Sequence, residues 1–300
     1  MKKVIELRNV SKQFDGETVL DSINLDIYDN EFLTLLGPSG CGKTTTLRMI
    51  GGFETPDQGD ILFLGERIND IPPHKRNINT VFQRYALFPH LDVYDNIAFG
   101  LRARGIYKQE KNSVDEFIEM VGLKGFEQSY PHQLSGGLRQ RVMIGMAMVC
   151  NPDLLIADEP TTALDVTIEA QILHLMRQLQ KDKGTSIMMI THNLGVVAEI
   201  CDQVYVMYAG KVVESAEVHE LFQNPKHPYT QGLLGALPKM DSRQRLNSID
   251  GMVPTLKDMP TGCRFAPRCP MATQKCREEQ PALVDVTAEH QVRCFMSCSK

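Results

Sequence analysis

Long apolar runs are missing from this sequence of 300 residues, and so is any excess of positive charge. The longest apolar run near the middle, residues 142–150, is far shorter than the stretch of about 20 residues that a membrane-spanning helix needs. The N-terminus continues into charged sequence and lacks the apolar core of a signal peptide. We therefore expect a cytoplasmic protein without a membrane span.

The charge balance and the cysteines narrow the class of protein further. Lysine and arginine number 32 against 37 aspartates and glutamates, a net charge of -5 that gives no reason to expect a nucleic-acid partner. Five of the eight cysteines lie in the last forty residues. Such crowding in a cytoplasmic chain suggests a metal site rather than disulfide bonds.

A glycine-rich stretch follows the apolar residues 32–36 and precedes a run with helical character. Strand, glycine-rich loop and helix in this order form the context of a phosphate-binding loop. The glycines let backbone N–H groups surround an anion, and the helix N-terminus adds partial positive charge. Lys43 can reach the β- and γ-phosphates of a nucleotide, and the Thr44 hydroxyl can hold Mg²⁺. The residues predicted to surround the phosphates are Gly37, Pro38, Ser39, Gly40, Cys41, Gly42, Lys43, Thr44 and Thr45.

Two carboxylates end a later apolar strand, at residues 154–159. A buried strand that delivers acids to its C-terminal tip usually delivers them to a site. Asp158 suits the binding of Mg²⁺, directly or through water, and Glu159 suits a general base or a residue that orients water. The alternative is a pair of acids that only caps a turn.

Three further side chains end predicted strands or turns. Gln83 follows a short strand, where α/β folds place ligand contacts, although a solvated loop glutamine is the alternative. His192 follows another strand and either contacts a γ-phosphate or serves as a turn residue. Phe14 lies at the turn of an expected hairpin, residues 4–10 and 19–27, where it either packs the hairpin or stacks on a base.

A second candidate anion site precedes a strongly apolar helix that ends near Cys150. Ser135 is a good N-cap for this helix, and Gly136 and Gly137 permit close approach of another backbone. The helix N-terminus then presents its own partial positive charge. From residue 92 to about 122 the apolar residues also recur at helical spacing.

These motifs stand in the order and spacing of an ABC transporter ATPase subunit, and the chain resembles that family from residue 1 to about 220. The Ser-Gly-Gly signature separates this family from the kinases, GTPases and helicases that share the phosphate-binding loop. The resemblance implies an α/β fold with a RecA-like P-loop core, an antiparallel β subdomain and a helical signature subdomain at about residues 90–150. It places the ATPase domain at residues 1–221.

The resemblance also implies a role for each matched residue. Phe14 looks like the aromatic residue that stacks on adenine, and Gln83 like the residue that links Mg²⁺ and the attacking water to the transporter interface. Glu159 resembles the catalytic glutamate, His192 the switch histidine, and Asp165 an aspartate that communicates across a dimer. The implied cofactors are ATP and Mg²⁺, with the ion near Thr44, Gln83 and Asp158.

The family works as a head-to-tail pair of subunits. The resemblance implies that ATP bound at Lys43 of one subunit meets Ser135, Gly136 and Gly137 of a second subunit, which is either an identical or a related chain. ATP then favours closure of the pair, and hydrolysis removes that preference.

Two parts of the chain resemble different relatives. Residues 1 to about 100, and 79–90 above all, are similar to spermidine/putrescine importer ATPases, whereas residues from about 125 to 300 resemble oligopeptide/dipeptide/nickel importer ATPases. We expect the ATP-hydrolysing subunit of an importer that powers peptide uptake through a separate membrane permease, supplied by an extracytoplasmic solute-binding protein. Polyamine uptake is the near alternative, and a soluble ABC ATPase without a transport role is the remote one. The expected location is the cytoplasmic face of the inner membrane.

Residues 222–300 are similar to the C-terminal extension of the peptide importers and are rich in proline and cysteine. Four thiolates satisfy either a cubane iron–sulfur cluster or a tetrahedral zinc ion, and their spacing does not choose between these or no metal. Some relatives with this extension hold a [4Fe–4S] cluster, so the resemblance implies one here. The four expected ligands are Cys263, Cys269, Cys276 and Cys294.

Overall fold

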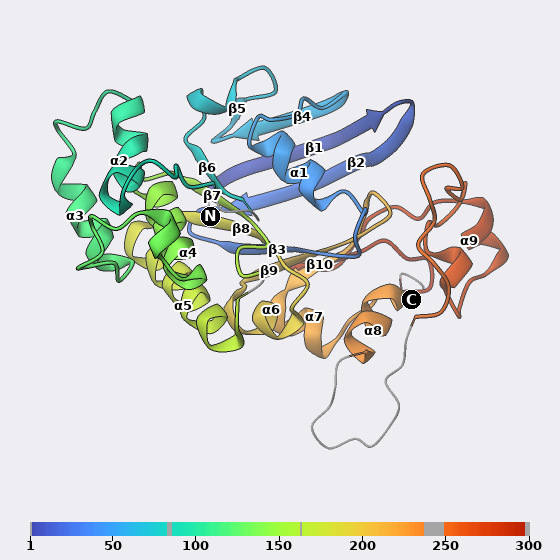
Figure 1. Cartoon of the computed structure of the whole chain (residues 1–300). Helices are drawn as coiled ribbons and strands as arrows, with labels where there is room; N and C mark the ends of the chain where they lie inside the picture. The colour runs from blue at the N-terminus through green and yellow to red at the C-terminus, as the bar shows by residue number, and fades with distance from the viewer. Residues whose placement is uncertain (1, 83–85, 163, 237–248, 298–300) are drawn as a thin grey trace.

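The computed structural model describes residues 2–82, 86–162, 164–236 and 249–297 (Figure 1). Within these residues the strands form two sheets. The smaller sheet is antiparallel, in the order β2-β1-β4-β5, and its first two strands form the predicted hairpin. Its strands are β1 (Lys3–Phe14), β2 (Glu17–Tyr28), β4 (Gln58–Phe63) and β5 (Glu66–Arg67).

The larger sheet has the order β11-β12-β10-β9-β3-β8-β7-β6. The five strands from β9 to β6 are parallel, so their carboxyl ends meet at one edge, while β10, β12 and β11 are antiparallel. This edge is where parallel sheets place ligand sites. The strands are β3 (Phe32–Leu36), β6 (Ile78–Val81), β7 (Leu154–Asp158), β8 (Ser186–Ile190), β9 (Gln203–Tyr208), β10 (Lys211–Glu217), β11 (Val284–Thr287) and β12 (His290–Val292).

The central strands are covered on both faces, which is why they read as apolar runs. In β8, Ile187 and Met189 face one apolar cluster and Met188 and Ile190 face the other, as the two-residue period of a strand requires. One cluster holds the smaller sheet and α1, and the other holds α4, α5 and α6 (Figure 1). The phosphate-binding loop therefore leaves a strand that is fixed from both sides.

The predicted helical subdomain lies at one end of the molecule and helix α9 at the opposite end (Figure 1). No helix within the described ranges is long and apolar enough to cross a membrane. The helices are α1 (Lys43–Ile50), α2 (Val93–Ala103), α3 (Lys111–Met120), α4 (Gly136–Met148), α5 (Val166–Lys183), α6 (Leu194–Ile200), α7 (Val218–Gln223), α8 (Pro228–Gly235) and α9 (Gln274–Glu278), with 3-10 turns η1 (Pro73–Lys75), η2 (Pro131–Gln133) and η3 (Ala266–Arg268).

The C-terminal extension is joined to the main sheet. Its strand β12 pairs with β10, aligning Val292 with Glu214 and His290 with Ala216, and β11 then pairs with β12. The expected boundary between residues 221 and 222 falls inside helix α7. The extension thus shares main-chain hydrogen bonds with the sheet that carries the phosphate-binding loop.

Candidate functional site

The phosphate-binding loop connects β3 to α1, and two of its glycines are required by close packing. Gly42 caps α1 with a φ of 100°, and a Cβ there would lie 2.3 Å from Leu20 Cδ2. A Cβ on Gly37 would lie 2.3 Å from the carbonyl oxygen of Met207. Any side chain at these positions would push the loop away from β2 and β9.

Lys43 lies inside this loop. Its ammonium group donates hydrogen bonds to the carbonyl oxygens of Gly37 at 2.7 Å and Pro38 at 2.8 Å, and the residue is buried. The charge is therefore held at the place where a nest of backbone N–H groups would receive phosphate.

Asp158 ends β7 beside the loop and hydrogen-bonds with Thr44. Burial, followed by the negative charge of Glu159, raises the pKa of Asp158, and the Thr44 hydroxyl and the charge of Lys43 only partly oppose this shift. A raised pKa means that the carboxylate charge is not fully compensated. A hydroxyl and such a carboxylate side by side are oxygen donors that suit Mg²⁺.

Glu159 is held by contacts at the ends of β7 and β8. Its carboxylate lies 2.6 Å from His192 Nε2 and accepts a hydrogen bond from the Thr162 hydroxyl at 3.0 Å. Its backbone N–H donates to the carbonyl of Ile190 at 3.1 Å. Glu159 has a φ of 47°, an uncommon value for a residue with a side chain, and this backbone conformation turns the carboxylate off the strand direction.

Lys43, Thr44, Glu159 and His192 face one open cleft of about 240 Å³, while Asp158 lines a neighbouring cavity that Thr44 also lines. Sequence reasoning had named most of the cleft lining but missed Val19 and Ile190, and it had not paired Thr162 with Glu159. The available signal for Val19 was its place on the strand that packs against the loop. The lining consists of Val19, Ser39, Gly40, Gly42, Lys43, Thr44, Thr45, Glu159, Ile190 and His192.

Other predicted residues within the described ranges do not line this cleft: Phe14, Gly37, Pro38, Cys41, Ser135, Gly136, Gly137, Asp158 and Asp165. Ser135 is exposed at the N-terminus of α4, where its hydroxyl accepts a hydrogen bond from Leu138 N–H at 3.4 Å. Asp165 caps α5 and accepts from Ile168 N–H at 2.9 Å. Phe14 is 40% exposed, with the Lys12 ammonium 5.2 Å from the centre of its ring.

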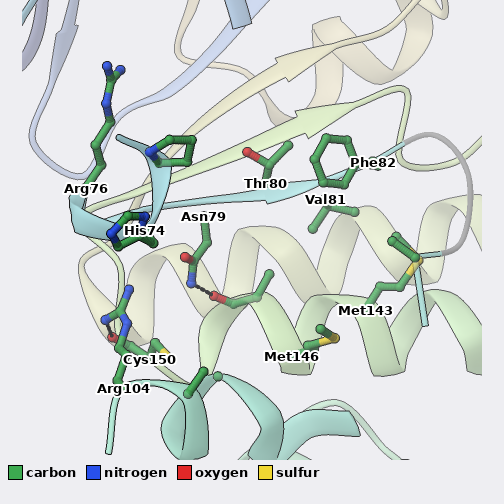
Figure 2. Close-up of a pocket in the computed structure, with 15 residues that line it drawn as sticks. His74, Arg76, Asn79, Thr80, Val81, Phe82, Arg104, Met143, Met146 and Cys150 are labelled. Atoms are coloured by element: carbon green, nitrogen blue, oxygen red, sulfur yellow. Dashed lines mark hydrogen bonds between the residues drawn. The ribbon is translucent and has the colours of Figure 1, made fainter. Parts of the chain in front are cut away.

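Gln83 lies outside the described residues, so its predicted position is not observed. The strand that precedes it, β6, ends beside a second and larger hollow of about 420 Å³ between the core and the helical subdomain. Figure 2 shows Phe82 and Val81 above this hollow and Met143 and Met146 of α4 below it. Arg104 and His74 lie at its other end, so the hollow has an apolar floor and a basic rim (Figure 2). We call it the groove.

The four predicted ligands of the extension, Cys263, Cys269, Cys276 and Cys294, line one small cavity, which we call the cysteine pocket. All seven cysteines within the described ranges are free. Burial raises the pKa of the Cys263 and Cys269 thiols, so both are neutral near pH 7. The pocket has a volume of about 10 Å³, and no group of three or more histidine, cysteine or acidic side chains among the described residues is arranged to hold a metal ion.

A phosphate-binding loop that faces two carboxylates and a histidine across the carboxyl edge of a parallel sheet defines a P-loop ATPase. Residues 20–162 match the ABC transporter family, and residues 213–276 match the oligopeptide/dipeptide transporter C-terminal region. The oligopeptide transport ATP-binding protein AppD of Bacillus subtilis is 42% identical over 99% of this chain and 97% of its own length. The chain therefore belongs to the ATP-binding proteins of ABC transporters, which are ATPases.

Other relatives are named for a different solute. The spermidine/putrescine import ATP-binding protein PotA of Clostridioides difficile is 44% identical over 78% of this chain and 68% of its own length. The likeness extends to solved structures. An ATP-binding cassette captured as a dimer in a post-hydrolysis state with ADP and Pi is 29% identical, with a TM-score of 0.63 over 71% of this chain and 98% of that one.

Proposed function

We propose that this chain hydrolyses ATP to drive solute uptake through a separate membrane permease. The observation that carries the proposal is the single cleft in which Lys43 and Thr44 face Glu159 and His192, with Asp158 hydrogen-bonded to Thr44. Glu159 would take a proton from the attacking water, and Lys43 and His192 would stabilise the charge that develops on the γ-phosphate. Thr44 and Asp158, with Gln83, would hold Mg²⁺, which neutralises charge on the β- and γ-phosphate oxygens.

The contact between Glu159 and His192 fits this assignment. A carboxylate that accepts hydrogen bonds from both His192 and Thr162 is fixed in direction, and fixed direction is what a water-orienting base needs. The alternative interpretation, in which the two carboxylates only cap a turn, does not require these partners.

We further propose that the active form is a head-to-tail dimer. Ser135 and its helix N-terminus are exposed and stand apart from the described cleft lining, so one chain supplies only half of the phosphate contacts. A second subunit would bring its Ser135 and Gly137 to the nucleotide at Lys43. Because the phosphate charge is then neutralised only in the closed pair, ATP favours closure and its hydrolysis releases it.

The groove is our candidate for the permease contact. Its occupant would be a short cytoplasmic helix of the permease with an apolar face for Met143 and Met146 and an acidic group for Arg104. Methionine side chains adapt to a partner surface, and a like charge placed there would repel it. Met146→Glu should therefore abolish association with the permease while the isolated subunit keeps its ATP turnover. Met252→Glu, on an 87% exposed residue of the extension, is the matched control.

We propose peptides as the solute, with polyamines as the alternative. The peptide-type relative aligns with almost the whole chain, and the extension matches the peptide-transporter C-terminal region. The polyamine-type relatives align over about three quarters of this chain, at up to 46% identity. Purification of the complex from native membranes in mild detergent tests this. Recovery of a peptide-type permease pair supports the proposal. Recovery of a polyamine-type permease contradicts it and supports polyamines as the solute.

A [4Fe–4S] cluster in the cysteine pocket is proposed separately, with zinc as the alternative. Its support is the convergence of four thiols, a donor set that suits either metal site, on one cavity. The cavity has room for about one water molecule. The loops that carry Cys263 and Cys269 must therefore move apart to admit a cluster. Metal analysis of anaerobically purified protein decides between iron with sulfide, zinc and neither.

A further inference from the structure

One buried arginine of the extension, Arg264, contacts the part of the core that lies beside the nucleotide cleft. We propose that Arg264 is a positioning residue for the phosphate-binding loop, so that the C-terminal extension is a structural part of the ATP site. This inference rests on the proposed function, since it assumes that the cleft beside Lys43 receives ATP. It concerns the residue next to Cys263 and does not depend on any metal.

Arg264 connects the extension to two separate parts of the core. Its side chain is 7% exposed and donates to the Asp21 carboxylate of β2 at 2.5 Å. The same guanidinium donates to the carbonyl oxygen of Ala209, in the turn between β9 and β10. Lys211 also pairs with Asp21, at 2.9 Å. An arginine fork is suited to two acceptors in fixed directions, and a lysine is not.

Both partners of Arg264 are linked to the phosphate-binding loop through Gly210. Asp21 N–H donates to the Gly210 carbonyl at 3.1 Å, and Gly210 N–H donates to the carbonyl of Cys41, inside the loop, at 3.1 Å. Val19 lies on the same face of β2 as Asp21 and lines the cleft.

The turn that holds Gly210 packs closely against β2. A Cβ on Gly210 would lie 2.3 Å from the Val19 carbonyl oxygen. The turn, strand β2 and the loop are therefore in direct contact, and a displacement of one moves the others.

Removal of Arg264 would leave the Ala209 carbonyl without its buried donor and Asp21 with one cation instead of two. We expect the turn to relax and the Gly210–Cys41 hydrogen bond to weaken. Nucleotide affinity should then fall about tenfold, which corresponds to the loss of one hydrogen bond to a charged group. Glu159 and His192 lie at the ends of other strands. We therefore expect kcat to change by less than about twofold, which is smaller than the expected change in nucleotide affinity.

The test compares Arg264→Gln with Arg268→Gln in the full chain. Arg268 belongs to the same extension but donates to the carbonyls of Ile249 and Asp250, and among the described core residues it hydrogen-bonds to the Tyr208 hydroxyl, 3.4 Å away. The measurements are ATP binding, KM and kcat for ATP, and hydrogen exchange at the Gly210 amide. We expect Arg264→Gln to raise KM and speed that exchange, and Arg268→Gln to do neither.

Two more variants test whether Arg264 acts through Asp21. Asp21→Asn should raise KM as well, and the double variant with Arg264→Gln should show less than the sum of the two effects, because both act through one contact. Arg264→Lys keeps a charge for Asp21, should fold, and should restore part of the affinity.

Unchanged ATP binding in folded Arg264→Gln, or in Asp21→Asn if the glutamine variant does not fold, overturns the inference. Equal effects of Arg264→Gln and Arg268→Gln overturn it too, since they would show only a general need for the extension. Failure of the wild-type protein to hydrolyse ATP would instead contradict the proposed function.

Discussion

The nucleotide cleft and the cysteine pocket differ in how their groups are held before any ligand arrives. In the cleft, Lys43 and Glu159 are already fixed by hydrogen bonds to the loop and to His192, around an open space of about 240 Å³. In the pocket, the cysteines surround about 10 Å³, and burial keeps Cys263 and Cys269 as neutral thiols. The cleft is built to receive a ligand as it stands, and the pocket must change to do so.

The difference follows from the elements that carry each site. The cleft residues leave the ends of parallel strands that are paired on both sides, so their positions are set by main-chain hydrogen bonds. The cysteines come from short turns and a helix of five residues, whose main-chain hydrogen bonds are local to the extension, such as that from Cys263 N–H to the Cys276 carbonyl at 2.8 Å. A charged site on a rigid sheet edge can act without rearrangement, whereas a thiol site on loops can respond to what it binds.

The largest expected effect is the loss of ATP turnover when the cleft loses its proposed base. Glu159→Gln keeps the shape of the side chain but cannot accept a proton from water, so turnover should fall by about 10² to 10⁴. ATP binding should persist, because Lys43 and the loop are unchanged. Phosphate release and nucleotide binding are measured together, with Glu199→Gln on the exposed side of α6 as the control. Normal hydrolysis by Glu159→Gln would reject its role as base.

A glycine pair tests how rigidly the loop is held. Gly42→Ala combines a φ of 100° with a clash against Leu20, so we expect a loss of about 2–4 kcal/mol of stability. Gly40→Ala has a φ of 76° but open space around its Cβ, and should lose about 1–2 kcal/mol. Denaturant unfolding measures both. Equal losses would mean that packing against Leu20 does not fix the loop.

A cysteine pair tests the pocket. If a cluster or zinc is bound there, Cys276→Ser should lose most of the metal, whereas Cys150→Ser, on a half-buried cysteine near the groove, should keep it. Iron, sulfide and zinc are determined chemically, and visible absorbance reports a cluster. Equal metal content in the two variants would place the metal elsewhere.

The smallest expected effect is a pH-dependent change in stability at the contact between the extension and the core. Burial alone lowers the pKa of His290, but its hydrogen bonds with Glu214, at 2.7 Å, and Glu220 outweigh burial and raise it. The stability that protonated His290 contributes is therefore complete below about pH 6.5 and is lost as the pH rises through the raised pKa. His290→Gln should lower the unfolding midpoint more at about pH 6 than at about pH 8.

A neighbouring histidine has the opposite sign and must be separated from this effect. Burial lowers the pKa of His227 to about 4, so its contribution is present above about pH 6.5 and is lost as the pH falls toward 4. The comparison of His290→Gln with wild type at each pH cancels the His227 contribution. A difference between the two proteins that does not vary with pH would contradict the assignment for His290.

Most of the residues that line the cleft stand in short motifs at strand ends, which the sequence alone displays. The glycine loop, Asp158 and Glu159 are each recognisable locally, and parallel strands bring their carboxyl ends together. The pairing of Glu159 with His192 follows from β7 and β8 being neighbours, which single-strand patterns do not reveal. The local patterns thus point to these residues but not to their partners.

The link between the extension and the core was beyond sequence reasoning. Arg264 and Asp21 are 243 positions apart, and neither belongs to a periodic pattern. Strand β12 has three residues, too few for an apolar alternation to show, and its pairing with β10 depends on tertiary packing around His290. The extension therefore looked like a separate module.

The most direct measurement mixes two inactive subunits. Lys43→Ala removes the charge in the loop and Ser135→Arg blocks the second half-site, so each variant alone should lack turnover. In a mixed head-to-tail dimer, Lys43 of the Ser135→Arg chain faces Ser135 of the Lys43→Ala chain, and one of the two sites is intact. We predict that ATP hydrolysis returns on mixing. No recovery in a mixture that demonstrably forms the heterodimer would contradict the shared site.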